Sequence, residues 1–121
     1  DAIMARKAVT NKAWRFFRKY DLLLTHTTAV APFGLGIQGP PTIDGKKASP
    51  LQWIPFTFPF NMTGQPAASV PAGFTRDGLP VGLQIVGRHL DDPMVLRASA
   101  AYEAVAPWKD RWPPMLTEMG L

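Results

Sequence analysis

At 121 residues the chain can form at most one domain, and its hydrophobic fraction of 46% is that of a globular protein, which excludes wholesale disorder. Cysteine is absent, so disulfides and thiolate metal sites are excluded, and no apolar run approaches the roughly 20 residues needed to cross a bilayer. The net charge is +4, but six of the 13 basic residues fall within the first 20 positions, unlike the broad basic surface of a nucleic-acid-binding protein. We therefore expect a soluble, cytoplasmic protein that associates with neither a membrane nor a nucleic acid.

Residues 2–20 have the pattern of an amphipathic helix, because apolar residues recur at spacings of three and four. The apolar stripe consists of Ala2, Ala5, Val9, Ala13, Phe16 and Tyr20. Basic residues occupy the opposite side, and Trp14 turns toward them. Either its ring lies along neighbouring Lys or Arg side chains, or it packs on protein that this chain lacks. The helical pattern begins directly at Asp1, which indicates a cut inside a larger domain.

A short buried strand is expected at Leu22–Leu24, because a continuous apolar run lacks the alternation of a half-exposed strand. His26 stands at its end. An imidazole titrates near neutral pH and suits general-base catalysis, but no nucleophile or carboxylate is close to His26 in the sequence. We therefore interpret His26, and His89 after a later strand, as structural residues.

Residues 32–50 are rich in Gly and Pro and predict a loop, with a turn at residues 44–47 whose two lysines are solvated. Gly34-x-Gly36-x-x-Gly39 formally matches a dinucleotide-binding fingerprint. Pro40-Pro41 follows where that motif needs the free N–H groups of a helix start. We therefore expect a loop and no cofactor.

Residues 51–61 are unusually apolar for a connection, and Pro55 and Pro59 exclude a long helix or a central strand. Aromatic side chains on a segment stiffened by proline suit one wall of a binding pocket, and plain core packing is the alternative. The candidates for the pocket wall are Trp53, Ile54, Phe56 and Phe58. The amide of Asn61, which follows, can satisfy backbone donors at a turn or helix start.

Two strands are expected next, near Ala68–Val70 and at Val81–Val86. The Asp77-Gly78 pair between them favours a turn and antiparallel pairing. Gly82 and Gln84 share one face of the second strand, and the small Gly82 leaves room for close packing there.

A helix is predicted from Asp91 or Asp92, which caps it, through Pro93 in its first turn to the stop at Pro107. Its apolar stripe contains Val95, Ser99, Tyr102 and Ala106, with Leu96 and Val105 at the edges. The tail 108–121 is expected to lie extended over the surface.

Three ordered blocks between residues 61 and 87 resemble the C-terminal portion of amidase signature enzymes. They read Asn61-x-x-Gly64-x-Pro66, Ser69-Val70-Pro71-Ala72-Gly73, and GLPVGLQIVG from Gly78. The resemblance extends back to residues 20–25, with His26 in place of the usual proline, and forward to Glu103. It implies an α/β fold, in which residues 1–121 are a C-terminal fragment of an α/β/α layered domain with a mixed central sheet. The motif residues with implied structural roles are Asn61, Gly64, Pro66, Pro71, Gly73, Gly82, Gln84 and Gly87.

The resemblance also implies amide hydrolysis by a Ser–Ser–Lys mechanism, in which a lysine held neutral is the base. The serines of this chain are Ser49, Ser69 and Ser99, and none has a Gly-Ser-Ser or Gly-x-Ser-x-Gly context. We therefore expect the catalytic residues upstream of Asp1 and none in this chain, with no metal ligands and no cofactor. The isolated chain is expected to be inactive.

The parent protein is accordingly predicted to hydrolyse small neutral or aromatic amides. Family members that act on aminoacyl-tRNA are expected to carry an acidic residue near Ile54, to receive the amino group of the substrate, and here that neighbourhood is apolar. Two alternatives are a fragment of a tRNA-dependent amidotransferase A subunit, and an interaction module that uses the basic helix. The expected partners are the missing N-terminal catalytic portion of the same domain, an amide substrate, and further copies of the fragment.

Overall fold

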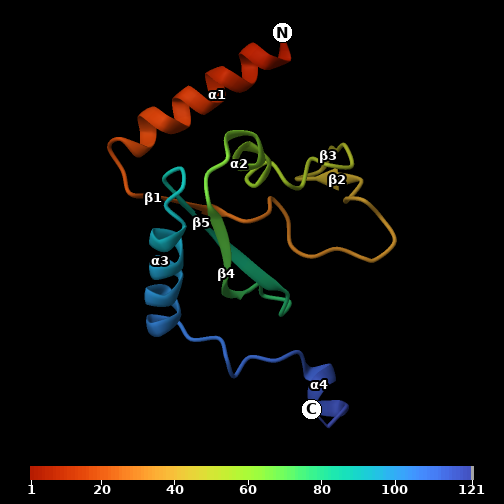
Figure 1. The fold of residues 1–121 in the computed structure, drawn as a ribbon. Helices are drawn as coiled ribbons and strands as arrows, with labels where there is room; N and C mark the ends of the chain where they lie inside the picture. The colour runs from red at the N-terminus through yellow and green to blue at the C-terminus, as the bar shows by residue number, and fades with distance from the viewer. Residues whose placement is uncertain (121) are drawn as a thin grey trace.

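The computed structural model describes residues 1–120, so Leu121, the end of the expected tail, lies outside the described residues. Its elements are, in chain order, α1 (Ala2–Phe17), β1 (Leu22–His26), β2 (Thr42–Ile43), β3 (Lys46–Lys47), α2 (Phe58–Thr63), β4 (Ala67–Phe74), β5 (Pro80–Gly87), α3 (Asp92–Val105) and α4 (Pro114–Glu118). β1, β5 and β4 form a sheet in that spatial order. Figure 1 shows α3 beside this sheet, α1 and α2 toward the top of the view, and α4 at the far end of the C-terminal segment.

The central strand β5 is antiparallel to both of its neighbours, which confirms the expected pairing with β4. Ile85 lies opposite Leu24 of β1 and Ala68 of β4. The strand expected at residues 22–24 is present, but it is not buried: β1 is an edge strand, and Leu24 is 57% exposed. The reason is that α3 packs over β5 and β4, so the apolar run on β1 has little cover. Any parallel pairing in a mixed sheet would require strands beyond these three.

The apolar core lies between the sheet and α3, where Val70, Ile85 and Val95 are buried against one another. Gly87 makes this close packing possible, because a Cβ atom there would lie 2.7 Å from Cγ2 of Val95. The predicted start of α3 is confirmed, since the Asp91 carboxylate accepts the N–H of Met94 at 3.3 Å.

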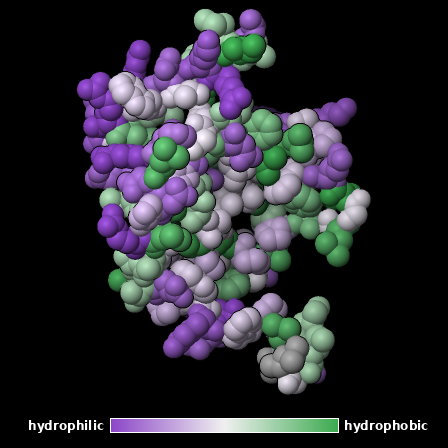
Figure 2. All heavy atoms as spheres, viewed as in Figure 1, coloured by the Kyte–Doolittle hydropathy of each residue, from purple (hydrophilic) through white to green (hydrophobic). Residues whose placement is uncertain are grey.

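Helix α1 begins where expected but ends at Phe17, three residues before the predicted end. Phe17 is its buried residue, and Tyr20, assigned to the apolar stripe, is exposed beyond the helix end. The guanidinium carbon of Arg18 lies 5.1 Å from the centroid of the Trp14 ring, which confirms that this exposed indole lies against a basic side chain. Figure 2 shows hydrophilic side chains gathered where α1 crosses this face of the molecule.

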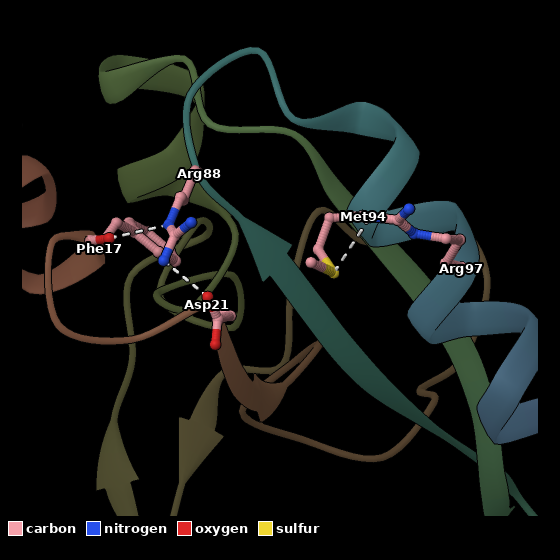
Figure 3. A network of polar contacts seen from close by, with 5 residues as sticks. All are labelled: Phe17, Asp21, Arg88, Met94 and Arg97. Atoms are coloured by element: carbon pink, nitrogen blue, oxygen red, sulfur yellow. Dashed lines mark hydrogen bonds and ion pairs between the residues drawn. The ribbon is translucent and has the colours of Figure 1, made fainter.

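Arg88, directly after β5, ties the sheet to the connection between α1 and β1 (Figure 3). Its Nε donates to the backbone oxygen of Phe17 at 3.0 Å, and its Nη2 lies 2.6 Å from the Asp21 carboxylate. Both charged side chains are exposed, so the ion pair contributes little to stability. The hydrogen bond to the Phe17 carbonyl at the end of α1 contributes more, because that carbonyl has no partner within the helix. Arg97 and Met94, also drawn in Figure 3, make a separate contact within α3.

Four short elements, α2, β2, β3 and α4, were not expected from the sequence. The turn at residues 44–47 is confirmed, with positive φ at Asp44 and Gly45, but it also joins the short strands β2 and β3 into a hairpin. The tail was expected to be extended throughout, and this was wrong for α4. Short helices of this kind carry little periodic signal in the sequence.

We expect the isolated 121-residue chain to associate with itself. Leu24 on the sheet edge, Leu96 and Val105 on α3, and Ile3 and Met4 on α1 are large apolar side chains that remain exposed. Both β1 and β4 also have one edge without a partner strand among the described residues, and such edges favour pairing with another chain. Light scattering should detect dimers or larger species whose proportion rises with concentration. A monodisperse monomer with a cooperative thermal transition would contradict this expectation.

Candidate wall of a substrate pocket

Gln84 holds the apolar segment 51–57 against the central strand. Its side chain is 4% exposed, and its Nε2 donates to the backbone oxygen of Phe56 at 2.9 Å and to Oγ1 of Thr25 at 2.8 Å. One buried amide therefore joins β5, β1 and the segment that precedes α2. Because buried polar groups need partners, the Phe56 carbonyl has a defined position relative to the sheet.

The hydroxyl groups of Thr27 and Ser69 meet next to Gln84 on the same face of the sheet. Their oxygen atoms are 2.7 Å apart, and a Cβ atom at Gly82 would lie within 3 Å of both. The expectation that Gly82 leaves room for close packing is thus confirmed. This contact links the end of β1 to β4 across the central strand.

The candidate Trp53 packs against the loop rather than into a hollow. Its Nε1 donates to the backbone oxygen of Gln38 at 2.8 Å, and its ring meets Phe33 edge to face at 5.3 Å between centroids. Gly39 passes so close that an added Cβ would lie 2.8 Å from the indole ring. Trp53 therefore anchors the loop 33–39 to the segment.

Two other candidates, Ile54 and Phe58, lie together in a groove of about 320 Å³. Its remaining lining residues are Leu51, Pro55 and Pro59, so every side chain in it is apolar. The two prolines stiffen the segment as expected, and Pro59 lies in the first turn of α2. The groove is the part of the candidate wall that can receive an apolar group.

The fourth candidate, Phe56, lies beside His26 instead, with 5.8 Å between the ring centroids. His26 is exposed and lines a smaller hollow of about 190 Å³ at the ends of β1 and β5. No hydrogen bond from its ring to a serine or carboxylate is found within residues 1–120. His89 is structural, as predicted, because its Nδ1 is 2.9 Å from the backbone oxygen of Gly64.

The motif residues occupy turns and strand contacts. Gly64 ends α2 with φ of 77°, and the backbone oxygen of Pro66 accepts the N–H of Gly87 at 3.0 Å. Pro71 and Gly73 lie at an irregularity of the edge strand β4, where proline and positive φ are tolerated. The expected capping role of Asn61 was wrong, because Asn61 is exposed inside α2, whose N-cap is Thr57.

The described serines have structural environments. The Ser99 hydroxyl donates to the Val95 carbonyl within α3 at 2.8 Å, Ser69 contacts Thr27, and the Ser49 N–H donates to the Gln52 side chain. Within residues 1–120 no serine hydroxyl bonds to a lysine or histidine, and no group of His, Asp or Glu is placed to share a metal ion. No helix in this part of the chain is long and apolar enough to cross a membrane. The described serines thus lack the neighbours that would activate them as nucleophiles.

A larger hollow, of about 630 Å³, lies between the β4–β5 turn, the end of α3 and residues 107–114. It shares no lining residue with the groove at Ile54. The sequence had not pointed to it, although two tryptophans and an arginine cluster in the tail between residues 108 and 112. The smaller groove at Ile54 and Phe58 also includes Leu51, Pro55 and Pro59. These three were not predicted as pocket residues, although they belong to the same apolar segment.

These features define an α/β chain in which α3 packs on an antiparallel sheet and an apolar groove lies in the segment that leads into α2. A family model for amidases matches residues 1–96. The chain belongs to the amidase signature family, and the predicted α/β class is confirmed.

Similar proteins within the family include an acylamidase and A subunits of glutamyl-tRNA(Gln) amidotransferases. An acylamidase of Rhodococcus erythropolis is 48% identical over 100 residues, which are 81% of this chain and 21% of that protein. The A subunit of the glutamyl-tRNA(Gln) amidotransferase of Streptococcus gordonii is 39% identical over 99 residues, which are 82% of this chain and 19% of that protein. The chain thus spans about a fifth of the length of these relatives.

Both kinds of relative are also found among the solved structures that superimpose on this chain. A bacterial aryl acylamidase of the amidase signature family superimposes with a TM-score of 0.78 at 39% identity, covering 87% of this chain and 22% of that one. The A subunit of the glutamyl-tRNA(Gln) amidotransferase of Thermotoga maritima superimposes with a TM-score of 0.72 at 34% identity, covering 90% and 23%.

Proposed function

We propose that this chain is the C-terminal part of an amidase that hydrolyses small neutral or aromatic amides, and that it supplies one wall of the acyl pocket. The Ser–Ser–Lys catalytic residues lie in the remainder of the same domain, which is the partner of this chain. The observation that carries the proposal is the groove at Ile54 and Phe58, in which every lining side chain is apolar. The similarity to an acylamidase and an aryl acylamidase supports it.

The chemistry of the groove selects against a charged substrate. Burying an ammonium group without a counter-charge is costly, and the groove contains no carboxylate. A neutral acyl or aryl group instead gains from the removal of apolar surface from water, by about 25 cal/mol per Å². The volume of about 320 Å³ is that of the lower end of small-molecule sites.

A second candidate is the A subunit of a tRNA-dependent amidotransferase, which the Streptococcus gordonii relative favours. That function requires a carboxylate to receive an ammonium group of the substrate. The acidic residue is expected near Ile54, where this chain has Trp53, Ile54 and Pro55, so the carboxylate would have to come from elsewhere. For this reason we place the amidase first.

The two candidates predict different effects of Ile54→Asp. We expect the complete protein to hydrolyse 4-nitroacetanilide at least about tenfold more efficiently, by kcat/KM, than glycine 4-nitroanilide, whose acyl group differs by an ammonium. The substitution should reduce this preference by about tenfold, because it removes apolar contact and adds a counter-charge.

Leu35→Asp, the same kind of change at a fully exposed loop position, is the matched control and should leave the preference unchanged. A wild-type preference for the ammonium-bearing amide would favour the second candidate. Absence of hydrolysis of both amides would overturn the proposed amidase activity.

A further inference from the structure

The hollow of about 630 Å³ has the size and lining of a site for a small organic molecule. Four aromatic side chains line it: Phe74 at the end of β4, Tyr102 on α3, and Trp108 and Trp112 in the C-terminal segment. The rings of Tyr102 and Trp108 lie side by side, with 6.3 Å between centroids and a tilt of 30° between their planes. Such walls bind flat apolar groups by stacking and by removal of water.

The backbone of the β4–β5 turn keeps this hollow open. β4 leaves regular pairing between Pro71 and Phe74, and Gly73 there has φ of 111°. A Cβ atom added at Gly73 or Gly78 would meet nothing within 4 Å, so the turn borders open space. After Pro107 ends α3, the C-terminal segment crosses opposite this turn and forms the other wall.

Arg111 is the charged residue among those that line the hollow. Its guanidinium carbon lies 5.7 Å from the centroid of the Phe74 ring, so the charge is held at the aromatic wall. Among residues 1–120 the structure has one ion pair, between Arg88 and Asp21. Arg111 therefore makes no ion pair with a described carboxylate.

The end of α3 also borders the hollow, through Ala106, and a helix C-terminus carries about half a negative charge. The full positive charge of Arg111 exceeds this partial charge. An anion is therefore the favoured polar group of a ligand, because a guanidinium binds a carboxylate through two parallel hydrogen bonds.

We propose that this hollow is a binding site for a small aromatic carboxylate, with the ring system among Phe74, Trp108 and Trp112 and the carboxylate on Arg111. The site is separate from the proposed acyl pocket, with which it shares no lining residue. It does not require that the protein be an amidase.

Calorimetric titration of the complete protein with 2-naphthoate tests this assignment, with 2-acetylnaphthalene as a neutral probe of similar shape. We expect naphthoate to bind at least about tenfold more tightly than the ketone, because a hydrogen bond to a charged group is stronger than one to a neutral group. Arg111→Gln should weaken naphthoate binding by about tenfold and leave ketone binding unchanged. Ala72→Leu, which adds volume at the exposed edge of the hollow, should weaken both probes.

Lys109→Gln is the matched control, because it removes the same charge from an exposed neighbour that does not line the hollow. It should leave both affinities unchanged, and thermal unfolding should show that each variant is folded. The proposal is overturned if naphthoate does not bind, if Lys109→Gln weakens binding as much as Arg111→Gln, or if Ala72→Leu has no effect on either probe. Binding that survives all three substitutions would place the carboxylate at another site.

Discussion

Gly87→Ala is expected to lower the free energy of unfolding by about 1–3 kcal/mol, the usual cost of inserting a methyl group into packed structure. The new Cβ would lie 2.7 Å from Cγ2 of Val95 and 3.4 Å from the backbone oxygen of Asp91. Val95 has little freedom to move away, because a β-branched side chain in a helix has one preferred rotamer. The helix α3 must therefore shift from β5. Urea unfolding of the complete protein, followed by circular dichroism, measures the change.

Gly34→Ala is the control for this substitution, since an added Cβ there meets nothing within 4 Å. It should change stability by less than about 0.5 kcal/mol. In the double variant with Val95→Ala, the two substitutions should be less harmful than the sum of their separate effects, because the shorter side chain makes room for the new methyl group. Strict additivity would mean that Gly87 and Val95 do not compete for the same space.

Gln84→Leu is expected to cost about 1–3 kcal/mol, because it removes the buried donor of two partly buried hydrogen bonds while nearly preserving side-chain volume. Their acceptors are the carbonyl of Phe56 and the hydroxyl of Thr25. The segment that carries Ile54 loses its bond to the central strand, so the proposed pocket wall should also become less well positioned. For 4-nitroacetanilide we expect a several-fold rise in KM, measured by initial rates under conditions in which the variant is folded.

Gln38→Leu makes the same chemical change at an exposed position and should affect neither quantity. If Gln84→Leu lowered stability but left KM and the preference for neutral amides unchanged, Gln84 would have a purely structural role. Unchanged stability would contradict the view that the two hydrogen bonds of Gln84 stabilise the native state.

Much of the fold follows from local sequence signals. The start of α3 was predictable because Asp91 and Pro93 are suited to a helix N-terminus by their own side chains. The β4–β5 pair was predictable because a turn signal separates two runs that favour strands. In both cases the interacting residues are close in the sequence, so the spacing of residue types carries the information.

Contacts between distant residues were less predictable. The sequence suggested that one wall of a pocket contains Trp53, Ile54, Phe56 and Phe58. In the structure these four residues lie in three different environments. Trp53 joins a loop about 15 residues away, Phe56 meets His26, and Ile54 and Phe58 share the groove. An apolar pattern shows that a side chain avoids water, but it does not show which other apolar surface the side chain meets.

The sequence by itself determined the family resemblance, the α/β class and the absence of an activated serine context, because these depend on residue types at short, ordered spacings. Only the tertiary structure decided that Leu24 is exposed, that Gln84 joins three segments, and that a hollow with Arg111 lies beside the C-terminal segment. The physical reason is that burial and buried hydrogen bonds depend on which elements pack together, and that arrangement brings together residues far apart in the chain.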